Sequence, residues 1–364
     1  MCPLRPGGNP KRWTERHGRQ RIAPVSRNAE CPSSPRIPWW LWLNVMSLDA
    51  PLVAVLWQAA LARAHKVTLM PAVHLVLFLA VWVIYMLDRV LDGFSMPQAA
   101  KLSVRHDFYR RNRWLFLLLV IPFGVVTLLL LATTAIPSGI LWRGAALAFV
   151  VGLYLLHYAA RGHRPIYILG NMMACFLGGM VLWLLPLPPH FKMLFGTALF
   201  ALLVLAVSGR LQGGFRLVPK ELLCGYLFAV GCTLSVNFFT GDLHAHPFSM
   251  ETLMLALLCA VNCIAISFYE RETDAHNDRD AMSQTWPGVG RAYPTLLLVV
   301  AAVAVASLSR RLPMELLLYS VAVLLSTLLL GVLHRVAKRM APEMAHVLAD
   351  AAVALPMALL VFAL

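Results

Sequence analysis

The chain has 364 residues, of which 60% are hydrophobic and 13% carry a charge. No soluble domain of this size needs so much apolar surface, so these proportions exclude an ordinary soluble protein. The net charge of +14 comes without a recognisable nucleic-acid-binding motif. We therefore expect no nucleic-acid partner, and we attribute the charge to basic loops on one side of a lipid bilayer.

Residues 1–38 are rich in arginine, proline and serine and contain no apolar run. This composition is typical of a disordered cytoplasmic tail, and a transit peptide is the alternative. The rest of the chain, residues 39–364, is predicted to form one transmembrane domain.

Apolar runs of about 18 to 22 residues recur along this domain, and each is long enough to cross the ~30 Å hydrocarbon core as a helix. A chain in lipid must satisfy its backbone groups internally, so we expect an all-α fold, a polytopic transmembrane helical bundle of about nine to eleven helices. The expected helices lie at 39–62, 72–91, 114–134, 142–160, 167–187, 190–208, 222–240, 250–269, 292–309, 313–334 and 345–363.

The lysines and arginines indicate which loops face the cytoplasm. If the N-terminal tail is inside, 25 of the 31 basic residues lie in the tail and the inside loops, and 6 lie outside. We therefore expect an integral protein of a bacterial inner membrane. Its N-terminus and the loops after the second and eighth helices would face the cytoplasm.

The seven cysteines include no CxxC pair, and five of them lie in apolar segments. A thiol in such a segment usually acts as a small hydrophobic group. The sequence therefore predicts neither a disulfide framework nor a zinc site.

Two acidic clusters stand out among only 17 aspartates and glutamates. Asp88 and Asp92 lie in "YMLDRVLDG", at the end of the second expected helix. Glu270, Asp274 and Asp278 follow the eighth. Both clusters are expected on the inside face, although nearly 180 residues separate them.

Spacing by four residues places the members of each cluster on one helix face, about 6 Å apart along the axis. Like charges at this spacing repel unless a cation lies between them. Mg²⁺ takes carboxylate oxygens and keeps positions open for water and phosphate. The pattern predicts that Asp88, Asp92, Glu270, Asp274 and Asp278 bind Mg²⁺ and, through it, a diphosphate. A solvated helix end is the alternative for either cluster alone.

Basic residues accompany both clusters, and arginine matches phosphate oxygens in geometry and charge. Arg89 lies inside the first motif, and Lys220 opens a later helix on the same expected side. Arg110, Arg111 and Arg271 are further predicted contacts to the phosphates. For Lys220 an ordinary membrane anchor is the alternative role. Acids and arginines at a membrane surface suit a diphosphate with a lipid tail.

Asp49 lies inside the first expected helix, two residues before Pro51. An acid within a membrane-spanning segment is costly, so it is a functional candidate. We place Asp49 on the acceptor side of the substrate cavity, and a hydrogen bond to a neighbouring helix is the alternative.

The two acidic motifs resemble those of the UbiA-type superfamily of intramembrane prenyltransferases. Family members carry N-D-x-x-D-x-x-x-D after the second helix and D-x-x-x-D after a later one. Asp88 and Asp92 match the last two aspartates of the first motif, and "YERETDAHND", Tyr269 to Asp278, matches the second. The resemblance covers about residues 40–364.

This resemblance implies Mg²⁺-dependent transfer of a prenyl group from a polyprenyl diphosphate to an acceptor, such as an aromatic ring or an alcohol. It implies that the catalytic residues are Asp88, Asp92, Asp274 and Asp278. The family's asparagine falls on Ile84 and its first aspartate on Tyr85. Tyr85 is therefore expected to pack against the diphosphate or to replace a lost ligand through its hydroxyl.

The sequence leaves three functional readings open. The first is an integral membrane prenyltransferase-like enzyme whose acceptor is not identified. The second is a catalytically silent relative, because Ile84 and Tyr85 depart from the first motif. The third is a transporter or lipid-binding membrane protein whose acids bind a coupling cation. The acids lie at helix ends rather than in mid-membrane and no convincing internal repeat is present, which favours the enzyme.

Overall fold

The computed structural model describes residues 37–95, 103–159, 219–241, 248–277, 281–309 and 313–363. Within these ranges every regular element is a helix, which confirms the all-α class. Two of the expected helices, 167–187 and 190–208, lie outside the described residues, as does nearly all of the predicted tail.

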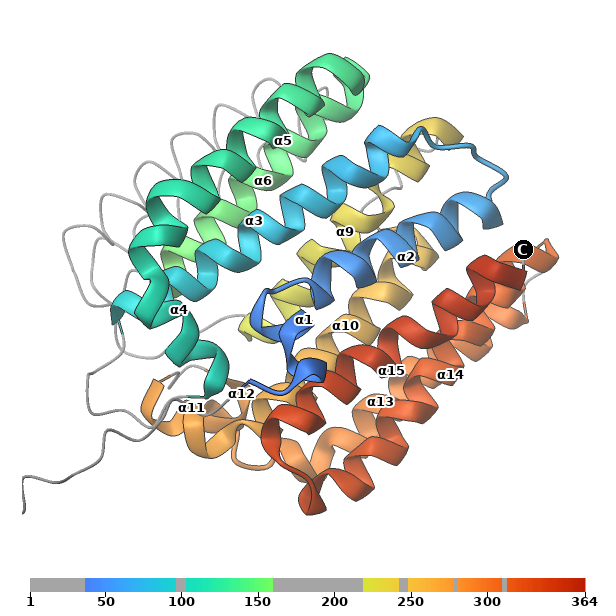
Figure 1. The fold of residues 1–364 in the computed structure, drawn as a ribbon. Coiled ribbons are helices and arrows are strands. Elements are labelled where there is room, and N and C mark those ends of the chain that lie inside the picture. The colour runs from blue at the N-terminus through green and yellow to red at the C-terminus, as the bar shows by residue number, and fades with distance from the viewer. Residues whose placement is uncertain are drawn as a thin grey trace, which may run out of the picture. The chain divides into compact units, whose positions relative to one another are not determined.

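The described elements are a series of helices (Figure 1). They are η1 (Trp39–Leu41), α1 (Trp42–Val45), α2 (Asp49–Ala64), α3 (Pro71–Ser95), α4 (Val104–Leu115), the π-helical turn η2 (Phe116–Val120), α5 (Ile121–Ala135), α6 (Ser138–Ala159), α9 (Lys220–Thr240), α10 (Met250–Tyr269), α11 (Arg271–Asn277), α12 (Met282–Thr285), α13 (Val289–Leu308), α14 (Met314–Val336), η5 (Ala337–Arg339) and α15 (Pro342–Ala363).

Seven helices among the described residues are long and apolar enough to cross a membrane. The bent pair Trp39–Val45 and Asp49–Ala64 raises the number to eight if it forms one span. These helices are consistent with an integral membrane protein.

The first expected helix, 39–62, is broken rather than continuous. α1 ends at Val45, and α2 begins at Asp49 after a bend of 77°. At the bend Ser47 has a positive φ of 52°, which few residues other than glycine adopt. Its hydroxyl forms a 3.0 Å hydrogen bond with that of Tyr109 on α4. Asp49 is therefore the first residue of a helix rather than a mid-helix residue, and the helix dipole favours its charge there.

Two helices reach further into the candidate site than the hydropathy pattern predicts. α3 continues past the expected end at residue 91 to Ser95, so Asp92 as well as Asp88 lies within its last turns. α4 begins well before the expected helix, and the side chain of Ser103 caps its first turn. Much of the predicted basic loop is therefore helical.

The core of the described bundle lies around α10, the most buried of its spans. α10 packs against α9, α13, α14 and α15, while α2 packs against α3, α9 and α15 (Figure 1). Trp57, Tyr293 and Tyr319 are the large aromatic side chains of this core. A Cβ atom on Gly225 of α9 would lie 2.5 Å from the backbone nitrogen of Ala260, so only glycine permits this close approach to α10.

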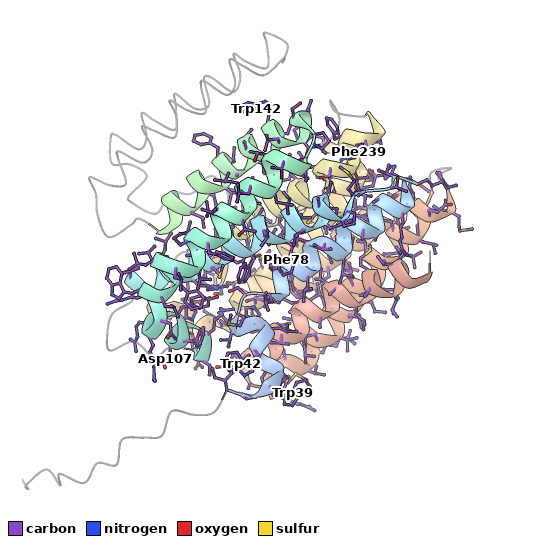
Figure 2. The ribbon with its side chains drawn as sticks, turned by 45° about the horizontal axis from the view of Figure 1, so that its top comes forward. Trp39, Trp42, Phe78, Asp107, Trp142 and Phe239 are labelled. Carbon is purple, nitrogen blue, oxygen red and sulfur yellow. The ribbon has the colours of Figure 1, made fainter. Side chains whose placement is uncertain are left out.

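Apolar and aromatic side chains cover much of the outer surface of the described helices. Phe123, for example, is 71% exposed. In Figure 2 the exposed rings of Trp39 and Trp42 lie towards one end of the bundle, and those of Trp142 and Phe239 towards the other. Exposed aromatic rings at two levels are typical of the two membrane–water interfaces.

Candidate functional site

A cavity of about 230 Å³, which we call the polar cavity, lies where α3 and α10 end and α2, α9 and α15 begin. Both predicted acidic clusters line it: Asp88 and Asp92 from α3, Glu270 at the end of α10, and Asp274 from α11. Asp278 lies outside the described residues. The fold therefore brings together two motifs that are nearly 180 residues apart in the sequence.

The first cluster surrounds an arginine, Arg89, whose side chain is 18% exposed. Arg89 Nη1 lies 3.8 Å from Asp88 Oδ2 and 3.8 Å from Asp92 Oδ2. These distances allow attraction between the charges but are too long for direct hydrogen bonds. The Nε atom of Arg89 is buried without a hydrogen-bond partner. Two carboxylates thus share one guanidinium, and Asp92 Oδ2 also lies 3.9 Å from His106 Nε2.

Glu270 is predicted as a metal ligand, and the structure places its carboxylate in a buried network. Its Oε2 accepts a hydrogen bond from Arg105 Nη2 at 3.2 Å, and its Oε1 lies 2.7 Å from His346 Nδ1. Burial alone would raise the pKa of Glu270, but the charge of Arg105 and the contact with His346 outweigh it and hold that pKa well below its usual range. Glu270 is therefore ionised, and it joins α10 to α4 and α15.

At Asp274 the nearby positive charges do not outweigh the effect of burial. Burial, followed by the negative charge of Glu270, raises the pKa of Asp274 to about 7, although Lys220, Arg105 and Arg89 act in the opposite direction. A carboxyl group with this pKa exchanges its proton readily near neutral pH, and a cation that binds in the polar cavity would displace that proton.

The predicted basic contacts divide into two groups. Arg89 and Lys220 line the polar cavity. Arg110 and Arg111 instead form ion pairs with Asp107 at 3.3 Å and 2.6 Å.

Asp107 lies on the outer side of α4 (Figure 2). Arg271 is exposed. Neither Arg271 nor the pair Arg110 and Arg111 is among the residues that line the polar cavity.

A second cavity, of about 280 Å³, adjoins the first, and we call it the apolar cavity. Its walls are almost entirely aliphatic and come from α3, α5, α6 and α9. It shares Ile84, Tyr85, Tyr154 and Cys224 with the polar cavity. Tyr85, predicted to contact a diphosphate, therefore lies where a charged space meets an apolar one.

Several residues of the polar cavity are absent from the sequence-based prediction. His346 and Asp350 come from the first turns of α15, and Asn262 from α10. With Asp49 they form the part of the wall nearest to α2 and α15. The sequence contained a signal for these residues. A histidine and an aspartate lie four residues apart in an apolar segment, and polar residues within such a segment are functional candidates for the same reason as Asp49.

The comparisons with known proteins return no match, whether against protein-family models, curated proteins or solved structures. The class of protein is therefore defined by the fold and the site alone. The chain is a helical bundle with membrane-spanning characteristics and a charged cavity at one end, and an apolar cavity adjoins that charged one.

Proposed function

We propose that this chain is a divergent member of the UbiA-type superfamily that transfers a prenyl group from a polyprenyl diphosphate to an acceptor. The observation that supports this proposal most strongly is the junction of the polar and apolar cavities. A lipid with a charged head needs both environments side by side, because burying either part in the wrong one is costly. A wholly polar or wholly apolar ligand would leave one cavity unmatched.

The diphosphate head would bind in the polar cavity together with Mg²⁺. The carboxylates of Asp88, Asp92 and Asp274 are the hard oxygen donors that Mg²⁺ prefers, and Asp278 remains part of this proposed set. The unpartnered Nε of Arg89 and the ammonium group of Lys220 suit phosphate oxygens. Bound Mg²⁺ would neutralise the diphosphate and so assist its departure.

The prenyl tail would lie in the apolar cavity. Ile84 and Tyr85 line both cavities, so the bond between the diphosphate oxygen and the allylic carbon would lie beside them. Breaking that bond leaves the electron pair on the diphosphate and a positive charge on the allylic carbon. The face of the Tyr85 ring can stabilise such a cation. An electron-rich atom of the acceptor then forms the new bond to the same carbon.

The distribution of basic residues supports a cytoplasmic site. Near the end of the bundle that holds the polar cavity, the described residues include Arg89, Arg105, Arg110, Arg111, Arg113, Lys220, Arg271, Arg291, Arg335, Lys338 and Arg339. At the opposite end the described basic residues are Arg63, Lys66 and Arg143. By the positive-inside rule, this asymmetry supports a polar cavity that faces the cytoplasm, and we propose a bacterial inner membrane as its location.

The reaction can be tested with purified protein in nanodiscs that is given geranylgeranyl diphosphate, Mg²⁺ and membrane extract as a source of acceptor. We expect release of diphosphate, which should fall at least tenfold in Asp88→Asn. Asp107→Asn is the matched control, because Asp107 is an aspartate near the same end of the bundle that pairs with arginines outside the cavity. Equal release by both variants would contradict the proposed role of Asp88.

A catalytically silent relative is the second candidate, and a specific observation favours it. Ile84 and Tyr85 stand where the family has an asparagine and an aspartate, and both line the polar cavity. Two of the family's polar groups are thus replaced at the site itself. Mg²⁺-dependent binding of the prenyl diphosphate without any release of diphosphate would support this second candidate.

A further inference from the structure

The polar cavity contains a second group of potential metal ligands, separate from the two acidic motifs. One ligand atom each from Asp49, His346 and Asp350 lies within 4.8 Å of the others, close enough for a single ion to contact all three. We propose that these three side chains, with Asn262, bind a divalent transition metal such as Zn²⁺. This site rests on its own geometry and does not depend on prenyl transfer.

The orientation of His346 favours a metal. Its Nδ1 lies 2.7 Å from Glu270 Oε1, and an ionised carboxylate can only accept a hydrogen bond, so Nδ1 carries a proton. In the neutral ring this leaves the Nε2 lone pair directed away from Glu270. Metal-binding histidines commonly donate their other N–H to a carboxylate, which fixes the tautomer and the plane of the ring.

Arg105 contacts this ring without occupying its lone pair. Its Nη1 lies 3.4 Å from His346 Nδ1 and 3.3 Å from Nε2. Nη1 is thus almost equally far from both ring nitrogens. In the plane of the ring, an atom at these two distances would clash with a ring carbon, so Nη1 lies over the face of the ring. Arg105 also holds the Glu270 carboxylate in place through an ion pair at 3.2 Å.

The separation between His346 and Asp350 suits two ligands of one ion. His346 Nε2 lies 3.4 Å from Asp350 Oδ2, slightly too far for a good hydrogen bond. Two ligand atoms that are each about 2.0 Å from Zn²⁺ in tetrahedral geometry are about 3.3 Å apart. The observed separation therefore matches a bridging metal better than a direct N–H···O contact.

Asn262 supplies an independent sign of a missing partner. Its Nδ2 donates to Asp350 Oδ1 at 2.8 Å, and this contact fixes which way the amide points, because a carboxylate cannot donate to Oδ1. The Oδ1 atom is then buried without a hydrogen bond in a residue that is only 8% exposed and lines the polar cavity. A buried acceptor without a donor is costly, and a cation would satisfy it.

Asp49 completes the group. Its two oxygens accept hydrogen bonds from Asn44 Nδ2 at 2.7 Å and from the backbone of Ala50 at 2.9 Å. These contacts hold the carboxylate in position, and each carboxylate oxygen has a further lone pair. Two carboxylates this close together repel unless a positive charge lies between them.

The donor set distinguishes this site from the proposed magnesium site. One imidazole nitrogen with carboxylate and amide oxygens suits Zn²⁺ or a similar transition metal, whereas carboxylates alone suit Mg²⁺. The proposed zinc site contains no cysteine, so the spacing of the cysteines in the sequence could not reveal this site.

The proposal can be tested on the full-length protein in nanodiscs after treatment with a chelator. Zn²⁺ is titrated by calorimetry in the presence of excess Mg²⁺, which occupies the acidic motifs. We expect one Zn²⁺ per chain in the parent and in Asp88→Asn, with binding at least tenfold weaker in Asp350→Asn. Glu270→Gln should weaken binding by about 10- to 100-fold, because Glu270 orients His346.

A measurement on the parent alone keeps the test independent of how the variants fold. X-ray absorption at the zinc edge should show one imidazole among the ligands. If the parent binds no Zn²⁺ in the presence of Mg²⁺, or binds it without an imidazole ligand, the proposal is overturned and His346 is an imidazolium between two carboxylates. Equal affinity in the parent, Asp350→Asn and Glu270→Gln would also overturn it.

Discussion

Arg105 and Glu270 form an ion pair in which the side chains are only 6% and 11% exposed. Removing one partner of such a pair leaves a buried charge without compensation, which typically costs about 3–5 kcal/mol. We predict that Arg105→Gln lowers the thermal unfolding temperature in detergent by far more than Arg111→Gln. The Arg111 side chain is 61% exposed in its pair with Asp107, and such surface pairs contribute at most about 1 kcal/mol. Similar shifts in the two variants would show that the buried pair is not a stabilising feature.

Asp274 makes cation binding sensitive to pH. Its pKa is raised from 3.8 to about 7, chiefly by burial and then by Glu270. The acid binds a cation only when it is ionised, so protons compete with Mg²⁺ increasingly as the pH falls through about 7. We predict that Mg²⁺ affinity at about pH 6 is about tenfold weaker than at about pH 8, which Mg²⁺ titrations at the two pH values would measure. In Asp274→Asn the difference in affinity between the two pH values should become smaller, and an unchanged pH dependence in that variant would exclude Asp274 as a source of it.

At the scale of single residues, the sequence could predict Asp88, Asp92, Asp274, Arg89 and Lys220 as residues of one site, and all five line the polar cavity. Their spacing along helices and their predicted side of the membrane were sufficient to group these five residues. Hydropathy and spacing could not predict the network of Glu270, because its partners Arg105 and His346 come from two other helices. Such a network depends on how helices pack, and a linear pattern does not contain that information.

At the scale of the helices, the contact between α9 and α10 gives a matched pair of tests. A Cβ on Gly225 would meet the backbone of Ala260 at 2.5 Å, whereas a Cβ on Gly231 would meet only a side-chain atom of Leu147 at 3.5 Å. We predict that Gly225→Ala destabilises the protein by about 1–3 kcal/mol, because α9 and α10 must move apart. Gly231→Ala should be neutral or stabilising, since alanine has the higher helix propensity. Thermal unfolding of both variants measures this, and a harmless Gly225→Ala would contradict the close packing.

The helix boundaries show what hydropathy can and cannot predict. α10 runs from Met250 to Tyr269, as expected, because polar residues bound its apolar run on both sides. The break before Asp49 was missed, since it depends on the backbone conformation of Ser47 and on a hydrogen bond to a residue of α4. The expected first helix therefore covers residues that are mostly helical, but a bend divides it into α1 and α2.

At the scale of the whole molecule, the proposed orientation can be measured by labelling. Asp107 and Trp142 lie towards opposite ends of the described bundle (Figure 2). In a background with Cys2→Ser and Cys31→Ser, we predict that a membrane-impermeant maleimide labels Trp142→Cys in intact cells. Asp107→Cys should react only after the membrane is opened. The reverse pattern would place the polar cavity on the outer side.

The measurement that tests the central claim most directly is calorimetric titration of geranylgeranyl diphosphate into the full-length protein in nanodiscs, with and without Mg²⁺. If the polar and apolar cavities form one site for a lipid diphosphate, binding should be saturable and Mg²⁺-dependent, and tighter than that of inorganic diphosphate or geranylgeraniol alone. The absence of binding, or binding that is equally tight without Mg²⁺, would contradict the account.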